Sequence, residues 1–385
     1  MREFDVVIYG ATGFTGRLVA EHLAQTYPTG VRWAMAGRSL GKLEEVRTLI
    51  GAPADTPLIT ADSDDPASLR AMVERATVVI TTVGPYQLYG SELVAACAAT
   101  GTGYVDLCGE PAWMRHMIDA HEAEARRTGA RIVFSCGFDS IPFDLGVLTL
   151  QEAAKARYGK PAPRVKGRVR SMQGTFSGGT AASLKATLAA AARDPAIVRL
   201  LTSPFALTPG FTGAHQPTGL IPEYDATLQA WVAPFVMAPI NTKSVHRTNV
   251  LLGEAYGADF VYDEMMVAGL GDIGKAAAEA IARFNPFAGD KGPKPGEGPS
   301  KAERDAGHYD ILFVGIMPDR SRIDTVVTGD RDPGYGSTSK MIAETALCLV
   351  EDGTTRGGIW TPGALLGATL RDRLIAKAGL GFVTS

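Results

Sequence analysis

The chain opens on the stretch that decides its fold, Phe4-Asp5-Val6-Val7-Ile8-Tyr9-Gly10-Ala11-Thr12-Gly13-Phe14-Thr15-Gly16. A short apolar run ends in three glycines spaced three residues apart, and a helical pattern with Leu18, Val19 and Leu23 on one side follows at once. A strand, a tight glycine turn and a helix form the context that a dinucleotide-binding turn requires. The glycine spacing alone leaves one alternative open, an ordinary turn between a strand and a helix.

Each glycine of this turn has a separate task. Gly10 lets the chain leave the strand in a conformation that a Cβ atom forbids. Gly13 lets the backbone approach a pyrophosphate, and Gly16 lets the helix lie close to the strand. The first amides of the helix then face the phosphates. We predict that the following residues bind the cofactor: Gly10, Thr12, Gly13, Phe14, Thr15 and Gly16.

The residues after the second expected strand indicate which dinucleotide fits. An NAD site places an acidic residue here to hold the ribose 2′-hydroxyl, but this chain has Ala36-Gly37-Arg38-Ser39 and no carboxylate. A guanidinium binds phosphate bidentately, and Lys42 lies one helical turn further on. We therefore predict NADPH (NADP+) as the cofactor, with Gly37, Arg38, Ser39 and Lys42 at its 2′-phosphate. The alternative is that Arg38 is a solvated turn residue.

Two further loops are expected to contact the cofactor. Asp62 follows the third expected strand, where a carboxylate reaches the adenine amino group. Val83, Gly84, Pro85 and Tyr86 follow the fourth. Ligands collect at the carboxyl ends of parallel strands, so this second loop is predicted to lie beside the nicotinamide.

Composition excludes several classes of protein. The chain has 385 residues and a net charge of −3, without the basic bias of a nucleic-acid-binding protein. Its four cysteines form no CxxC pair, which indicates buried, reduced thiols. We find no signal peptide, no membrane-spanning run and no metal-ligand spacing, so we expect a cytoplasmic protein without a metal site.

Strand and helix patterns alternate over the first 145 residues, which predicts an α/β fold with a Rossmann-type doubly wound parallel sheet. The later pattern predicts a second α+β domain with a mixed or antiparallel sheet. We expect three parts: an NADP-binding domain (1–145), a substrate and oligomerisation domain (146–331) and a C-terminal segment that returns to the first domain (332–385). Later strands are expected at 164–175, 244–252, 308–316 and 322–328, helices at 262–282 and 335–351, and a lid-like loop at 285–307.

The catalytic residues are the least determined part of the sequence. A reduction by NADPH needs a hydride at one atom of the substrate and a proton at another. Tyr86 is the first candidate proton donor, and Asp139 and Ser140, after the sixth strand, come next. The alternatives are that Tyr86 stacks on the nicotinamide and that Asp139 caps the helix starting at Ile141.

Nine motifs of this chain resemble the saccharopine dehydrogenase family. They are GATGFTG (10–16), AGRS (36–39), VGPYQLYG (83–90), YVDLCGE (104–110), CGFDSIPFDLG (136–146), SGGTAAS (177–183), PGEGPS (295–300), DPGYGSTSKMIAETALCL (332–349) and GGIWTPGALLG (357–367). The last six look most like the enoyl-reductase branch, whose members act in trans on polyketide or lipid intermediates. The resemblance implies a Rossmann domain, a second α/β domain, NADPH and a C-terminal return to the first domain.

The stretch from Leu200 to Asn241 bears on the substrate. It is rich in apolar residues and contains no Lys or Arg. A substrate with several carboxylates needs basic partners, so this stretch favours an acyl substrate. Together with the resemblance, this leads us to predict reduction of an enoyl bond in a small apolar or carrier-bound acyl substrate. The same residues also fit a core, the face of a homodimer or a membrane contact. Imine reduction in amino-acid metabolism and a non-catalytic NADPH sensor are the alternative functions.

Overall fold

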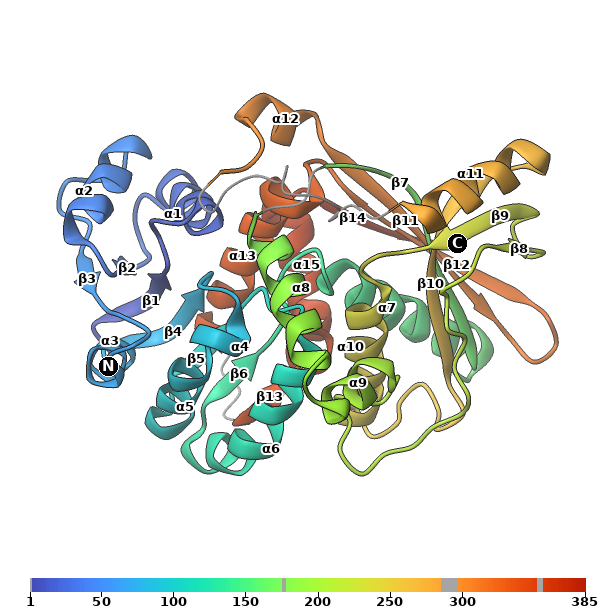
Figure 1. Ribbon diagram of the computed structural model, residues 1–385, viewed down its shortest axis with the longest axis horizontal. Coiled ribbons are helices and arrows are strands. Elements are labelled where there is room, and N and C mark those ends of the chain that lie inside the picture. The colour runs from blue at the N-terminus through green and yellow to red at the C-terminus, as the bar shows by residue number, and fades with distance from the viewer. Residues whose placement is uncertain (1, 175–177, 285–296, 352–355) are drawn as a thin grey trace.

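The computed structural model describes residues 2–174, 178–284, 297–351 and 356–385, which form two seven-stranded sheets surrounded by helices (Figure 1). In sheet A every neighbouring pair of strands is parallel. Its strands, in spatial order, are β13 (Gly358–Trp360), β6 (Arg131–Val133), β5 (Gly103–Val105), β4 (Ala76–Thr81), β1 (Phe4–Tyr9), β2 (Trp33–Gly37) and β3 (Leu58–Thr60). The order reverses between β1 and β4, which is where doubly wound sheets bind ligands.

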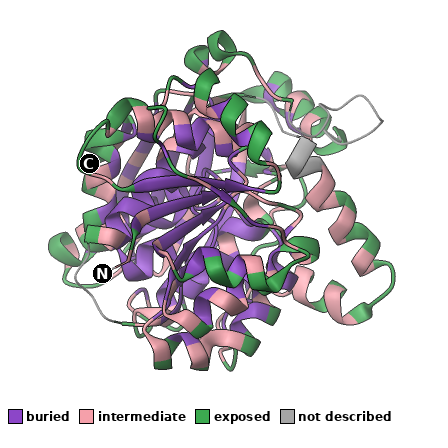
Figure 2. Ribbon diagram, turned by 90° about the vertical axis from the view of Figure 1, so that its left-hand side faces the viewer, coloured by how far each residue is buried: buried purple, intermediate pink, exposed green. Residues whose placement is uncertain are grey.

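Both faces of sheet A are covered by helices, and successive side chains of β1 point alternately to the two faces. Val6 and Ile8 point into one core and Val7 and Tyr9 into the other. Figure 2 shows the buried strands enclosed by half-exposed helices. The first core contains residues of α1 (Phe14–Thr26), α2 (Leu40–Leu49) and α13 (Thr338–Glu351), and the second contains residues of α3 (Pro66–Val73), α4 (Tyr86–Tyr89), α5 (Ser91–Thr100) and α6 (Pro111–Thr128).

Sheet B is mixed, because β7 and β10 pair in parallel and its other pairs are antiparallel. Its strands, in spatial order, are β14 (Leu380–Thr384), β12 (Arg322–Gly329), β11 (His308–Ile316), β7 (Arg164–Gln173), β10 (Val261–Gly269), β9 (Ala230–Pro234) and β8 (Glu223–Asp225). Helix α7 (Ile141–Tyr158) lies directly on this sheet. A Cβ atom at its Gly146 would approach the Phe313 ring to 2.3 Å, so only glycine permits this contact.

The remaining helices flank sheet B and connect it to sheet A. They are α8 (Gly178–Ala191), α9 (Pro195–Thr202), α10 (Ala238–Leu251), α11 (Gly271–Arg283), α12 (Lys301–Ala306), the π-helix η1 (Pro333–Ser337), α14 (Pro362–Leu365) and α15 (Gly367–Lys377). Helix α10 packs on β10 and α7, in the region between the two sheets (Figure 1). In the part of the chain that the structure describes, no helix has the length and apolar character needed to cross a membrane.

The C-terminal segment contributes to both sheets. Strand β13 pairs with β6 of sheet A, whereas β14 pairs with β12 of sheet B. Helix α13 packs on α1, where the Glu344 carboxylate lies 2.7 Å from His22 Nε2 and accepts the Tyr27 hydroxyl at 2.8 Å. The segment therefore joins the two halves, and the division of the chain at residues 145 and 331 stays a prediction.

The strand expected at residues 244–252 is wrong, because these residues lie in α10 and the turn after it. Val245, Thr248 and Val250 favour a strand by local preference. In the structure Asn241, Val245 and Thr248 are all buried by neighbouring elements. Tertiary packing of a helix that is buried nearly all round overrides the local preference.

The single helix expected at residues 262–282 is also wrong, because β10 and α11 divide this range. Gly269 and Gly271 have φ angles of +128° and +57°, which end the strand and start a new element. Met265 and Met266 pair with β7 on one side and β9 on the other, so partners far away in sequence hold them in a strand.

The lid-like loop expected at 285–307 lies partly outside the described residues, and its later part contains α12. Ser300 and Glu303 form a reciprocal capping box at the start of that helix, a signal present in the sequence. The helix expected at 335–351 is confirmed, with η1 forming its first turn.

Candidate active site

The glycine turn after β1 has the geometry of a phosphate cradle. Gly10 has a φ angle of +89°, and its carbonyl accepts the Gly13 N–H at 2.9 Å. A Cβ atom at Gly16 would lie 2.2 Å from the Gly10 oxygen, so α1 approaches β1 as closely as glycine allows. Among the described residues no side chain caps the start of α1 at Gly13, which leaves its first N–H groups for an anion.

The loops that the sequence assigns to the cofactor meet at one edge of sheet A. The Gly10 N–H donates to the Ala36 carbonyl at 2.9 Å, and a Cβ atom at Gly10 would lie 2.7 Å from Val83 Cγ2. The ends of β1, β2 and β4 are neighbours, which brings these loops together. The Asp62 carboxylate follows β3 and accepts the Asp64 N–H at 3.1 Å.

The residues expected at the 2′-phosphate lie at the start of α2. Ser39 is its N-cap and accepts the Lys42 N–H at 3.4 Å. Arg38 and Lys42 are exposed, and neither makes an ion pair with any described residue. Two cations without an ion pair to a described residue, close to the start of α1, fit a phosphorylated ribose and the adjoining pyrophosphate.

The loop after β4 is held by a buried carboxylate. Glu110 accepts the backbone N–H groups of Tyr86 and Gln87, both at 2.9 Å. The Tyr86 hydroxyl donates to the Thr81 carbonyl at 3.3 Å and accepts the Leu107 N–H at 3.1 Å, and burial raises its pKa well above the usual range. Both roles of this hydroxyl are therefore taken by the backbone, which favours another proton donor.

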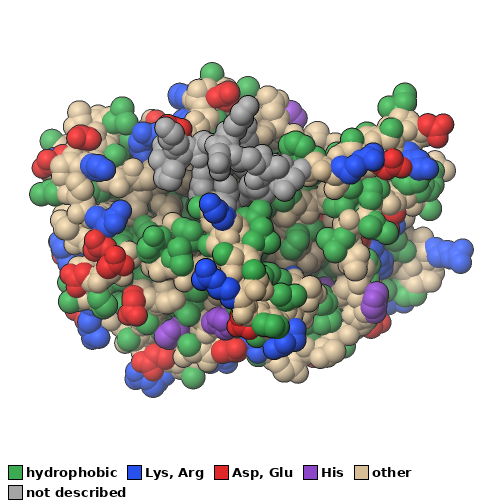
Figure 3. All heavy atoms as spheres, viewed as in Figure 1, with side chains coloured by type: hydrophobic (Ala, Val, Ile, Leu, Met, Phe, Trp, Pro, Cys, Tyr) green, Lys and Arg blue, Asp and Glu red, His purple; other side chains and the backbone are tan. Residues whose placement is uncertain are grey.

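A cavity of about 470 Å³ lies where the two halves of the molecule meet. The cofactor loops contribute Thr15, Gly84 and Tyr86, and the opposite walls come from α8, the end of β7 and the segment before α10. Figure 3 shows hydrophobic side chains gathered over α8 in the middle of this face. The apolar lining residues include Leu107, Phe138, Met172, Leu184, Leu188, Leu201, Val236, Met237 and Ile240.

The apolar stretch from Leu200 to Asn241 has no single role in the structure. Parts of it line the cavity, lie in the core or are exposed at the surface. Leu201, Val236 and Ile240 line the cavity. Leu207 and Phe235 lie in the core. A further part of the stretch, including Leu220 and Ile221, is exposed.

Asp139 differs from the other candidate donors. It lines the cavity on the loop between β6 and α7, and its carboxyl makes no hydrogen bond or ion pair with any described residue. Burial raises its pKa to about 7. It does not cap α7, whose N-cap is Ser140. Ser140 is fully buried away from the cavity lining and donates to the Ser244 hydroxyl at 3.3 Å.

A second buried carboxylate holds the loop that carries Asp139. Asp106 accepts the N–H groups of Cys108 at 3.0 Å and Ser135 at 2.7 Å, and the Tyr104 hydroxyl at 2.9 Å. Ser135, which lines the cavity, has a φ angle of +60°, a strained value for a residue with a Cβ atom. Asp106 therefore maintains the backbone at this wall of the cavity.

Sequence reasoning did not assign Tyr335 on η1 to the site, although this side chain lines the cavity. Asp332 caps this π-helix, accepting the N–H groups of Tyr335 at 3.0 Å and Gly336 at 2.7 Å. Short π-helical segments occur often at functional sites. The Asp332-Pro333-Gly334 sequence could have indicated this segment, since an Asp cap followed by Pro and Gly marks a capped turn rather than a regular helix start.

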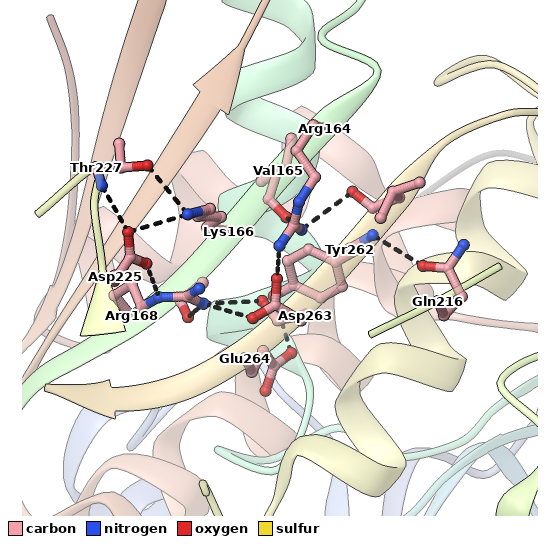
Figure 4. Close-up of polar contacts among 12 residues, drawn as sticks. Arg164, Val165, Lys166, Arg168, Gln216, Asp225, Thr227, Tyr262, Asp263 and Glu264 are labelled. Carbon is pink, nitrogen blue, oxygen red and sulfur yellow. Dashed lines mark hydrogen bonds and ion pairs between the residues drawn. The ribbon is translucent and has the colours of Figure 1, made fainter. Parts of the chain in front are cut away.

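Buried charges hold sheet B, whose strand β7 ends at the cavity (Figure 4). Arg168 is fully buried, and it donates to Asp225 and Asp263, each at 2.8 Å. Lys166 also donates to Asp225, at 2.9 Å, and Arg164 pairs with Asp263. These pairs fasten β8 and β10 to β7.

Comparison with known proteins identifies the family. Residues 6–133 match the model of the saccharopine dehydrogenase NADP-binding domain. A Mycobacterium tuberculosis protein, named as a candidate trans-acting enoyl reductase, is 42% identical over 413 residues, covering 100% of this chain and 98% of the relative. The trans-acting enoyl reductase of Mycobacterium leprae is 38% identical and covers 97% of this chain and 96% of the relative.

A solved structure shares the fold. Saccharopine dehydrogenase (L-Glu forming) from Saccharomyces cerevisiae superposes with a TM-score of 0.56 over 99% of both chains, at 11% identity. At that identity the likeness concerns the fold alone. The N-terminal domain is thus an NADP-binding domain, and the chain is an oxidoreductase that belongs to the saccharopine dehydrogenase family, in the branch of the trans-acting enoyl reductases.

Proposed function

We propose that this protein reduces the C=C bond of an apolar, carrier-bound enoyl substrate with NADPH, and that Asp139 supplies the proton. The cavity carries this proposal. Among its described lining residues Asp139 has the one carboxyl group, and neither Lys nor Arg occurs. An amino-acid substrate would bring carboxylates that such a wall leaves without partners. The relatives are named trans-acting enoyl reductases, which supports the same reaction.

Different residues of this chain act at the two ends of the cofactor: one set binds its phosphates, and Asp139 acts beside its nicotinamide. The glycine turn and the start of α1 hold the pyrophosphate, and Arg38, Ser39 and Lys42 bind the 2′-phosphate. When bound, NADPH supplies a hydride to the carbon β to the substrate carbonyl. Asp139, with its pKa raised to about 7 by burial, is protonated in part of the molecules at neutral pH and delivers a proton to the α carbon.

A substrate panel tests the function. NADPH oxidation is measured with 2-enoyl thioesters of pantetheine, with the saturated thioesters as controls, and with 2-oxo acids plus amines. We expect turnover with the enoyl thioesters alone. Turnover with an oxo acid plus amine, and none with enoyl thioesters, would establish imine reduction instead. Tight NADPH binding without turnover on any of them would indicate a sensor.

Arg38 should determine the preference for NADPH. We expect Arg38→Ala to weaken NADPH binding by about 1.5–3 kcal/mol, the usual contribution of a charged hydrogen bond, and to leave NADH binding unchanged. Fluorescence titration of both nucleotides measures this difference. Arg193→Ala, an exposed arginine beyond α8, serves as the control and should change neither affinity. Equal losses for NADPH and NADH would argue against a contact with the 2′-phosphate.

The pH dependence of turnover should follow Asp139. A general acid must be protonated, so kcat should be constant below pH 7 and fall by about tenfold per pH unit well above it. The midpoint follows from the pKa of about 7 that burial imposes on this carboxyl. Steady-state rates at saturating substrate and NADPH from pH 5.5 to 9 test the profile. A rate that rises with pH over this range would assign Asp139 the opposite role, that of a base.

A further inference from the structure

Tyr335 lies between the cofactor turn and the substrate cavity. Its ring meets the ring of Phe14, in the glycine turn, edge to face with centroids 4.9 Å apart. The same side chain lines the cavity together with Asp139. Tyr335 thus reaches both the region assigned to the phosphates and the region assigned to the chemistry.

The Tyr335 hydroxyl is an unusual polar group for a protein interior. The residue is 2% exposed, and its hydroxyl has no hydrogen-bond partner among the described residues. Burying a hydroxyl without a partner is unfavourable, so such groups call for a physical explanation. A bound molecule in the adjoining cavity would supply the missing partner.

The backbone around this hydroxyl is fixed relative to Asp139. Thr338 Oγ1 accepts the Phe138 N–H at 2.9 Å and donates to the Pro333 carbonyl at 2.8 Å. One side chain therefore connects the loop that carries Asp139 with the π-helix that carries Tyr335. Such a connection keeps the distance and orientation between the Asp139 and Tyr335 backbones fixed.

We propose that the Tyr335 hydroxyl donates a hydrogen bond to the carbonyl oxygen of the enoyl substrate and stabilises the negative charge that develops there. The inference rests on the proposed enoyl reduction. Burial, and the nearby charges of Asp332 and Asp139, raise the pKa of this phenol, so it stays protonated and acts as a donor. A preorganised donor at a developing oxyanion in an apolar cavity is a strong form of electrostatic catalysis.

The electrons and protons of this step balance. The hydride forms a C–H bond at the β carbon, and the π electrons of the C=C bond move to form an enolate whose oxygen accepts the Tyr335 hydrogen bond. The enolate then takes the Asp139 proton at its α carbon, and the carbonyl is restored. Tyr335 keeps its proton throughout, Asp139 is reprotonated from water, and NADPH leaves as NADP+.

Tyr335→Phe tests the assignment, because it removes the hydroxyl and keeps the ring against Phe14. We expect kcat with an enoyl thioester to fall by about 10²-fold, as for the loss of an oxyanion donor. The dissociation constant of NADPH, measured by fluorescence titration, should change less than twofold, roughly the scatter expected where no contact is lost. The melting temperature of the cofactor-free variant should equal or exceed that of the wild type, since the hydroxyl has no partner among the described residues of the folded protein.

Tyr256→Phe is the matched control. Tyr256 is also buried with a hydroxyl that has no partner among the described residues, but it is not among the cavity-lining residues. We expect this variant to keep the wild-type kcat.

Other outcomes would overturn the proposal. Unchanged kcat in Tyr335→Phe, with active wild-type enzyme, excludes the oxyanion contact and leaves the enoyl reductase function standing. A weakened affinity for NADPH with unchanged kcat would place the hydroxyl on the cofactor. A lower melting temperature together with equal loss in both variants would show a structural role. No turnover by the wild type would refute the proposed function itself.

Discussion

Asp139→Asn is expected to lower kcat for enoyl reduction by about 10²–10⁴-fold, the range that a positioned general acid contributes. The substitution keeps the shape of the side chain and removes its acidic proton. Asp139 makes no hydrogen bond with a described residue, so the substitution removes none of the polar contacts that the structure describes. The affinity for NADPH should therefore remain at the wild-type value, and the fall in rate above pH 7 should disappear.

The stability of this variant provides an independent measurement. The pKa of Asp139 is raised in the folded state, so its contribution to stability is fully present below the unfolded value near 3.8 and is lost as the pH rises to about 7. Asparagine carries no charge to desolvate. At pH 8 the melting temperature of Asp139→Asn should consequently be at least that of the wild type, while at pH 4 the two should converge.

Ser140→Ala separates the two neighbouring candidates of this loop. Its hydroxyl contacts Ser244 in the core and is not part of the cavity wall. We expect it to keep most of the wild-type rate. A large loss in Ser140→Ala, with wild-type rates in Asp139→Asn, would move the proton donor to Ser140 and refute the role proposed for Asp139.

Arg168→Met is expected to lower the free energy of unfolding by about 3–5 kcal/mol, the usual cost of removing one partner from a buried ion pair. The methionine fills similar space but leaves the Asp225 and Asp263 carboxylates in a buried environment without their shared cation. Equilibrium unfolding in urea measures the change, which should appear as a lower midpoint.

Arg170→Met supplies the matched control on the same strand. Arg170 pairs with Asp310 at 2.6 Å, but its side chain is 42% exposed, so the solvent screens the pair. We expect a loss of at most about 1 kcal/mol. Similar losses in both variants would mean that burial does not strengthen the Arg168 network, and that these pairs do not fasten β8 and β10 to β7.

Local signals explain how much of sheet A could be predicted. The β-branched run of β4, the glycine spacing after β1 and the apolar period of α6 are each readable within a few residues. The same reasoning places Gly10, Arg38 and Asp139 at strand ends, because the carboxyl ends of parallel strands share one edge. Helix α10, in contrast, buries polar and apolar residues alike, so its sequence lacks the separate polar and apolar faces that identify a helix.

The sequence by itself determined the doubly wound domain, its glycine turn and the cationic residues that follow β2, because these depend on backbone conformation and on neighbouring residues. Only the tertiary structure decided which candidate donor has an unpaired group in the cavity. Tyr86 and Asp139 both follow strands, but Tyr86 meets backbone partners from β4 and from the loop after β5, whereas Asp139 meets none among the described residues. Tyr335 lines the same cavity, although it lies far from both residues in the sequence. Burial and hydrogen bonding between such distant segments arise only when the chain folds.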